Sequence, residues 1–184
     1  MSDAPPAIVE GWYERAASAP ARVVLADLGD PRADAAADRL RTEGLAVVVE
    51  PVVDPADPAM VAAVARAAAA GLNPGDPVVA AAVLIASGGA DAGVAGATRP
   101  SAEVVRAGLA ILGVGDDEGL VSSCFILILP DGRPIAYGDC GVVPEPNVEQ
   151  LVAIARATAA TFECLTTESA RVALLSFSTR GSAT

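Results

Sequence analysis

From the N-terminus to about Gly113, short apolar runs alternate with longer segments that carry apolar residues at helical spacing. The short runs are rich in Val and Ala, and they predict buried strands over 22–26, 45–53 and 91–97. The longer segments predict helices over 7–19, 30–43, 55–70, 77–86 and 101–112, the last with Ser101 as its N-cap. Repeated alternation of strand and helix predicts an α/β fold in three α/β/α layers, with a mostly parallel sheet.

The pattern changes after Gly113. Apolar runs over 121–129 and 134–138 flank Asp131-Gly132, and this dipeptide predicts a β-hairpin because glycine supplies the positive φ of a tight turn. A long helix is expected over 147–162 and a last strand over 172–177. We therefore expect an N-terminal α/β domain over 1–132 and the start of a second α/β domain over 133–184.

The composition of the 184 residues narrows the possible chemistry. All 12 cationic side chains are arginines, because the sequence contains neither lysine nor histidine. A nucleophile activated by histidine, a histidine metal site and a lysine Schiff base are therefore excluded. Any side-chain cation that holds a phosphate or carboxylate must be arginine, whose planar fork suits bidentate contact. Aromatic residues make up 3% of the chain, so the core must consist of Ala, Val, Leu and Ile.

The net charge of −11 argues against binding to nucleic acid or to an anionic membrane surface. Cys124, Cys140 and Cys164 are widely spaced and odd in number, which predicts free thiols and no metal site. The first residues lack the features of a signal peptide, and no apolar run is long enough to span a membrane. These features predict a cytoplasmic protein.

Several motifs in the second half have the order and spacing seen in one known enzyme family. The motifs are Val121 to Phe125, Pro130-Asp131-Gly132, Gly138-Asp139-Cys140, Glu149-Gln150-Leu151 and the segment 172–182, Val-Ala-Leu-Leu-Ser-Phe-Ser-Thr-Arg-Gly-Ser. In them the chain resembles the phosphate acetyltransferase and phosphate butyryltransferase family. Weaker matches upstream include Asp91 with 94–97 and Arg106, and Asp30-Pro31-Arg32.

The resemblance implies transfer of an acyl group between coenzyme A and inorganic phosphate, in a cleft between two α/β domains. It implies a fold similar to that of the isocitrate and isopropylmalate dehydrogenases, and a homodimer. The expected partners are small molecules, namely acetyl phosphate and coenzyme A or acetyl-CoA, which are substrates; no bound cofactor is expected.

The residues expected to bind substrate fall into two groups. The resemblance implies that Arg106, Arg99 and Ser101 lie near one turn, and that a hydroxyl-rich turn contributes Ser176, Ser178, Thr179, Arg180, Gly181 and Ser182. Arg106 can instead lie on a solvated helix face, and Arg99 can serve the loop alone. Weaker candidates are Arg66 and Asp139, the latter of which can also cap a strand end.

Several differences from the family pattern affect this site. Thr98-Arg99-Pro100 stands where the family has a histidine or small polar residue, and Val105-Arg106-Ala107 stands where it has Leu-Arg-Pro. Ala26-Asp27 stands where the family usually has Pro-Glu, and Arg180 stands where it has the lysine of Ser-Thr-Lys-Gly-Ser. An arginine can still face a phosphate, but its larger fork does not sit as a lysine does.

No residue of this chain is assigned a catalytic role. The family's catalytic aspartate and adjacent Ser-Arg pair come from a segment near the C-terminus of a chain almost twice as long, and the sequence contains no counterpart. We therefore expect the isolated chain to be weakly active or inactive, unless a homo-oligomer or a complementing polypeptide completes it. The alternative is a non-catalytic module that keeps the family's dimerising or ligand-sensing surface.

Overall fold

The computed structural model describes residues 5–115 and 119–175 of the chain. The chain forms two compact units, which are described separately. The N-terminal unit is Val9–Val114, and the hairpin unit combines Met1–Ile8 with Gly115–Thr184. These units divide at a different place from the predicted domains, because a boundary between residues 132 and 133 would cut a hairpin. The assignment of domains to 1–132 and 133–184 stays a prediction.

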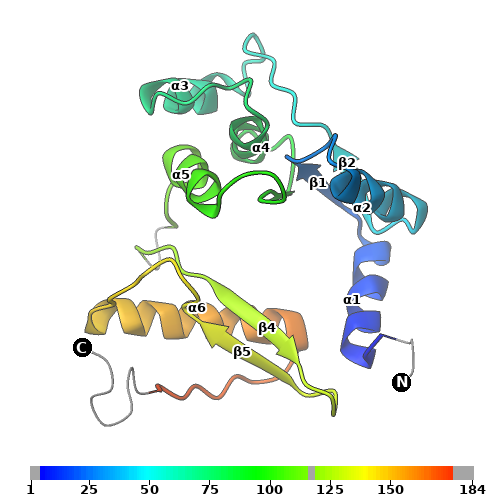
Figure 1. The fold of residues 1–184 in the computed structure, drawn as a ribbon, viewed down its shortest axis with the longest axis vertical. Helices are drawn as coiled ribbons and strands as arrows, with labels where there is room; N and C mark the ends of the chain where they lie inside the picture. Colours follow the sequence, from blue (N-terminus) through cyan, green and yellow to red (C-terminus); the bar gives the residue numbers. More distant parts are fainter. Residues whose placement is uncertain (1–4, 116–118, 176–184) are drawn as a thin grey trace. The chain divides into compact units, whose positions relative to one another are not determined.

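The N-terminal unit contains a three-stranded parallel sheet with the strand order β2-β1-β3. Figure 1 labels two of its strands, β1 and β2. Its strands are β1 (Ala21–Leu25), β2 (Ala46–Val49) and β3 (Ala92–Val94). Its helices are α1 (Ala7–Ser18), α2 (Pro31–Thr42), α3 (Val61–Ala69), α4 (Pro77–Ala86) and α5 (Ser101–Ile111). The predicted α/β class with a parallel sheet is confirmed.

Helices lie on both sides of this sheet. α2 packs against β2, whereas α4 packs against β1 and β3, and Figure 1 shows α2 and α4 on opposite sides of the strands. The strand order explains this placement: the chain moves outward from β1 to β2 and then back across β1 to β3, so right-handed crossovers must use opposite faces. α3 and α5 pack on α4 and extend its layer.

The core of the N-terminal unit is built around α4. Every residue from Val78 to Leu84 is buried, as expected for a helix that is apolar on all sides. Val24 of β1, Val83 of α4 and Ile111 of α5 are the largest fully buried side chains. Alanines of α3 and α5 fill the space between them. The core thus consists of small aliphatic residues, as the scarcity of aromatic residues predicts.

Aspartate caps set the start of two helices. Asp30 and Asp76 each precede a proline at the first helical position, and each side chain accepts from the N–H group two residues on, at 2.9 Å. For this reason the predicted starts of α2 and α4 agree with the structure. The prediction of Ser101 as an N-cap is wrong: Ser101 is the first helical residue, and Pro100 precedes it without a side-chain cap.

The predicted helix over 55–70 begins six residues late, at Val61. The carboxylates of Asp54 and Asp57 accept from the N–H groups of Ala56 and Ala59, both at 2.9 Å, and form turns that compete with a helix. The strand predicted over 45–53 also ends early, at Val49, where Pro51 cannot donate to a ladder.

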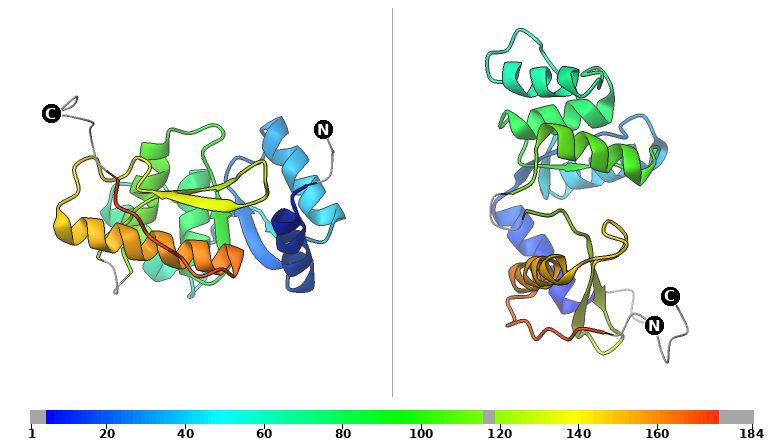
Figure 2. Two further views of the ribbon diagram at one scale, coloured as in Figure 1. Left: turned by 90° about the horizontal axis from the view of Figure 1, so that it is seen from below. Right: turned by 90° about the vertical axis from the view of Figure 1, so that its left-hand side faces the viewer.

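The hairpin unit consists of two antiparallel strands and one long helix. β4 (Cys124–Ile128) pairs with β5 (Pro134–Gly138), and Gly132 takes a φ of 86° in the turn, so the predicted hairpin is confirmed. α6 (Val148–Thr166) packs against β5 and lies along the hairpin (Figure 2). It begins with a capping box, in which Asn147 and Gln150 accept from each other's backbone N–H.

The chain after α6 does not form the predicted strand where it is described. Residues 172–175 have no ladder partner within 5–115 and 119–175, and Val172, Leu174 and Leu175 expose 57%, 73% and 78% of their surface. A strand needs a neighbour that supplies hydrogen bonds, and neither β4 nor β5 pairs with these residues. The rest of the predicted strand, Ser176 and Phe177, lies outside the described residues.

Asp139 organises the loop that follows β5. Its carboxylate accepts from the N–H and hydroxyl of Ser123 at 2.6 and 2.7 Å, and from the N–H groups of Val142, Val143 and Gly141 at 2.8, 2.8 and 3.2 Å. Burial by itself would raise the pKa of Asp139, but these hydrogen bonds outweigh it and hold that pKa well below the usual range. Asp139 therefore acts as a structural cap in the described unit, the alternative that its sequence context left open.

Gly138 allows α6 to approach β5 closely. A Cβ at this position would collide with Thr158 Oγ1 and lie 3.2 Å from the carbonyl oxygen of Ser123. We expect Gly138→Ala to lower the free energy of unfolding by about 1–3 kcal/mol, because helix and strand must move apart. Gly108→Ala is the matched control: it lies inside α5 with open space around it, and we expect a gain of about 0.5–1 kcal/mol. Denaturant unfolding measures both, and equal effects would contradict this packing.

Candidate functional site

The chain leaves β1 and β3 in opposite directions, which creates a place where ligands bind in α/β proteins. After β1 the chain enters α2 on one side of the sheet, and after β3 it enters α5 on the side of α4. β1 and β3 are neighbouring parallel strands, so both connections start at the same edge of the sheet. Crevices at such switch points, outside the carboxyl ends of the strands, are the usual ligand sites of open α/β sheets. We call this place the switch edge; it comprises residues 27–32 and 96–102.

Asp27 joins the two connections of the switch edge. This side chain follows β1, its residue is 6% exposed, and its carboxylate accepts from the N–H groups of Ala97 and Thr98, each at 3.0 Å. The Thr98 hydroxyl also donates to Asp27. This hydroxyl and the two N–H groups lower the pKa of Asp27, although burial acts in the opposite direction. Asp27 is therefore an ionised and poor base that holds the turn after β3 in place.

Arg32 holds the same turn from the first residues of α2. Its guanidinium forms a bidentate pair with Asp30 at 2.9 and 3.0 Å and donates to the carbonyl oxygen of Ala97 at 2.8 Å. The pair with Arg32 lowers the pKa of Asp30 to about 2. Both sides of the Ala97 residue, its N–H and its carbonyl, are thus fixed by residues of the first connection.

Two of the predicted substrate-binding residues, Arg99 and Ser101, lie at the switch edge, and Arg99 is already paired. Its guanidinium contacts Asp76 at 2.6 Å and Glu103 at 3.2 Å. Ser101 is exposed at the first position of α5, where backbone N–H groups point out of the helix and attract anions. An anion at this helix end would compete with the two carboxylates for Arg99.

Arg106 lies on α5, five residues after Ser101, and it is exposed. A shallow hollow surrounds it, lined by Ala102, Val105, Leu109 and Ala110. Ala102 lies one helical turn before Arg106 on the same face of α5, on the side of the helix start. No ion pair involves Arg106 within the described part of the chain, which leaves its guanidinium available to a ligand.

The other predicted binding residues, Ser176, Ser178, Thr179, Arg180, Gly181 and Ser182, lie outside the described residues. Their role stays a prediction.

Arg66 has a structural contact: it donates to the carbonyl oxygen of Ile111 at 2.8 Å and caps the end of α5. The three cysteines are free thiols. Within residues 5–115 and 119–175, no cluster of acidic or cysteine side chains could hold a metal ion. No helix in those ranges has the length and apolar character that crossing a bilayer requires.

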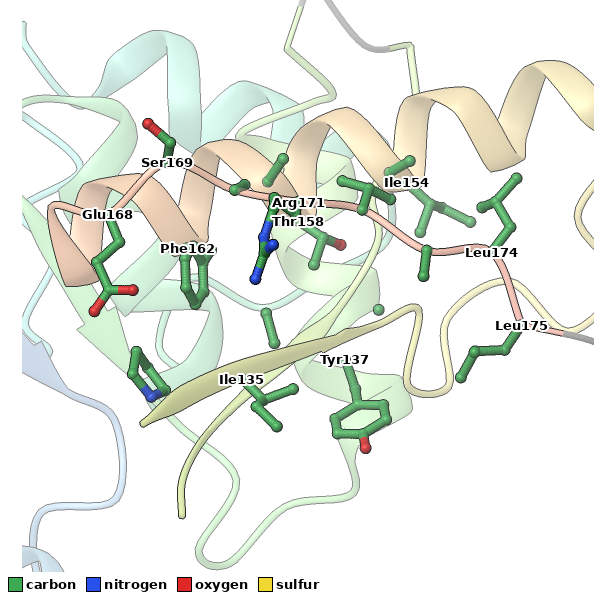
Figure 3. Close-up of a pocket in the computed structure, with 18 of the residues that line it drawn as sticks. Ile135, Tyr137, Ile154, Thr158, Phe162, Glu168, Ser169, Arg171, Leu174 and Leu175 are labelled. Atoms are coloured by element: carbon green, nitrogen blue, oxygen red, sulfur yellow. The ribbon is translucent and has the colours of Figure 1, made fainter. Parts of the chain in front are cut away.

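A second hollow lies within the hairpin unit, with a volume of about 630 Å³. β5, α6 and residues 168–175 form its walls, and its lining is largely apolar (Figure 3). Arg171, Phe162 and Thr158 are among the residues that line it. Thr158 Oγ1 is buried and has no hydrogen-bond partner among the described residues. We favour the switch edge as the candidate site, because polar and cationic groups from two connections converge there.

Sequence reasoning did not assign roles to Asp27, Arg32 and Thr98. An acidic residue directly after a buried strand is a signal that could have identified Asp27, since this position lies at the ligand-binding edge of an α/β sheet. Thr98 follows β3 in the same way. The contact of Arg32 with Ala97 spans 65 positions and leaves no local pattern in the sequence.

Comparisons with known proteins give a consistent result. A model of the phosphate acetyl/butaryl transferase family matches residues 59–184. A phosphate acetyltransferase of Paracoccus denitrificans is 36% identical over 93% of this chain and 62% of its own length. A phosphate acetyltransferase of Treponema pallidum is 41% identical over 58% of this chain and 34% of its own length. The chain thus spans less than two thirds of the length of these relatives.

Two solved structures share the fold. A phosphotransacetylase from Streptococcus pyogenes superposes with a TM-score of 0.80 at 22% identity, over 100% of this chain and 65% of the other. The EutD phosphotransacetylase from Staphylococcus aureus gives a TM-score of 0.75 at 21% identity, over 96% of this chain and 63% of the other.

Proposed function

The chain belongs to the phosphate acetyl/butaryl transferase family, and from this we propose that it takes part in transferring an acetyl or other acyl group between coenzyme A and inorganic phosphate. The observation on which the proposal rests is the switch edge, which lies at the carboxyl ends of β1 and β3 and includes the start of α5. Backbone N–H groups of this turn, Ser101 and Arg106 are suited to a phosphate group of either substrate.

We propose binding of substrate as the main property of these 184 residues, with slow turnover by the isolated chain. Formation of the thioester from acetyl phosphate and coenzyme A needs a base that takes the proton from the coenzyme A thiol. The carboxylates of Asp27 and Asp30 at the switch edge are poor bases, because their hydrogen bonds lower their pKa values. The alternative function is binding of substrate without turnover, and the low basicity of these two carboxylates supports it. A homo-oligomer or a complementing polypeptide remains part of the proposal.

The test measures the affinity for coenzyme A by calorimetry and the rate of thioester formation from acetyl phosphate and coenzyme A. We expect Arg106→Ala to weaken binding about tenfold or more, because a charge-assisted contact to phosphate contributes roughly 1.5–3 kcal/mol. Arg41→Ala is the matched control: Arg41 is also on a helix of this unit and pairs with Asp38 at 3.6 Å. We expect it to bind like wild type.

Three results separate the alternatives. Binding that depends on Arg106 without measurable turnover supports the binding function of these residues. Turnover that disappears in Arg106→Ala supports acyl transfer by the chain itself. Equal affinity of wild type, Arg106→Ala and Arg41→Ala contradicts the assignment of the switch edge.

A further inference from the structure

Some polar groups of the switch edge are hydrogen-bonded within the protein, and others are free to contact a ligand. The Asp27 carboxylate accepts from the N–H groups of Ala97 and Thr98 and from the Thr98 hydroxyl. Arg32 donates to the carbonyl oxygen of Ala97. These donors are therefore engaged within the protein and are not free to contact an anion. The N–H group of Glu103 is engaged as well, because it donates to the carbonyl oxygen of Pro100 at 3.0 Å. Contacts to phosphate fall instead to the start of α5, at Ser101 and Ala102, and to Arg106.

We infer that Asp27 and Arg32 are positioning residues, which fix the turn 96–100 and through it the first turn of α5 in the orientation that binds phosphate. This inference rests on the proposed function. The turn is short: two residues, Arg99 and Pro100, separate Thr98 from Ser101. A shift of the turn would therefore move the start of α5 with it. Binding a preorganised turn costs less ordering entropy than binding a mobile one.

The two partners differ in a way that makes the inference testable. Asp27 is buried, so its removal threatens folding as well as binding. The Arg32 side chain is 70% exposed, so its contact with Ala97 can be removed at little cost to the fold. Thr98 offers a third handle, because replacement by valine removes the hydroxyl and keeps the shape of the side chain.

The matched control lies on the same helix. Arg41 of α2 pairs with Asp38, as Arg32 pairs with Asp30, but the ion pair of Arg41 is local to α2. Arg41→Ala therefore removes an exposed arginine and an ion pair without releasing the turn. Thr98→Ser serves as the conservative variant, since it keeps the hydroxyl that donates to Asp27.

The experiment measures coenzyme A affinity of the full chain by calorimetry, and amide hydrogen exchange at Ala97 and Thr98. We expect Arg32→Ala and Thr98→Val each to weaken binding roughly fivefold and to speed this exchange, with a thermal midpoint close to that of Arg41→Ala. We expect Arg41→Ala and Thr98→Ser to stay within about twofold of wild type in affinity. If the hydroxyl is what matters, Thr98→Ser keeps the affinity for coenzyme A that Thr98→Val loses. Loss of packing alone would not give this difference, because serine lacks the methyl group of threonine.

The outcomes distinguish this inference from the proposed function. If wild type binds coenzyme A and both Arg32→Ala and Thr98→Val bind equally well, the positioning role is overturned while the function stands. If the affinity falls but the exchange at Ala97 and Thr98 is unchanged, the positioning role is also overturned, because the effect does not pass through the turn. If wild type does not bind, the proposed function fails and the positioning role fails with it.

Discussion

Asp139→Ala should lower the free energy of unfolding by about 3 kcal/mol, one of the two largest effects we expect in this chain. The substitution leaves three loop N–H groups and both donors of Ser123 without their acceptor. Each buried donor left unsatisfied costs about 1–3 kcal/mol, and water can satisfy those near the surface. Urea unfolding, followed by circular dichroism, gives the midpoint and slope that this prediction needs.

Asp131→Ala provides the matched control for this substitution. Asp131 is also an aspartate of the hairpin unit, but its side chain is 54% exposed and its partners are the N–H and guanidinium of Arg133. We expect a loss below about 1 kcal/mol. A loss in Asp139→Ala no larger than that in Asp131→Ala would contradict the role of Asp139 as the organiser of this loop.

The Asp139 carboxylate also makes the free energy of unfolding depend on pH. The pKa of Asp139 is lower in the folded than in the unfolded chain, so its stabilisation is present above the unfolded pKa of about 3.9 and is lost as the pH falls below it. Asp139→Asn cannot lose this contribution. Its free energy of unfolding should therefore fall less steeply below about pH 4 than that of wild type.

Ile111→Ala should lower the free energy of unfolding by about 2–5 kcal/mol, through loss of buried apolar surface and the cavity that remains. Ile111 is 1% exposed and packs in the cluster that surrounds α4. Leu109 lies on the same helix and is 44% exposed, so Leu109→Ala is the matched control, with an expected loss below about 1 kcal/mol. Thermal and urea unfolding measure both variants. Similar losses would show that the core is not centred where we describe it.

The sequence predicts the fold well wherever local chemistry is decisive. The Asp-Pro starts of α2 and α4 and the Asp131-Gly132 turn are correct, because each depends on neighbours in the chain. The predicted start of α3 is wrong because Asp54 and Asp57 form turns that an Ala-rich pattern does not reveal. The strand expected over 172–177 shows a further limit, since pairing depends on what lies beside a strand and not on its own residues.

The candidate site is harder to predict, because its contacts join residues distant in sequence. The resemblance to the family identified Arg99, Ser101 and Arg106, and the structure places the first two at the switch edge. It could not reveal that Arg99 is shared between Asp76 and Glu103, or that Asp27 anchors Thr98 across 71 positions. These contacts depend on the order of the strands, which brings β1 and β3 together.

The most direct test of the switch edge as the ligand site is a titration of the chain with coenzyme A, followed by the backbone amide resonances. We expect the chemical shift changes to concentrate at 96–102 and around Arg106. Changes confined to the hollow of the hairpin unit, at Ile135, Tyr137 and Phe162, with 96–106 unaffected, would contradict it.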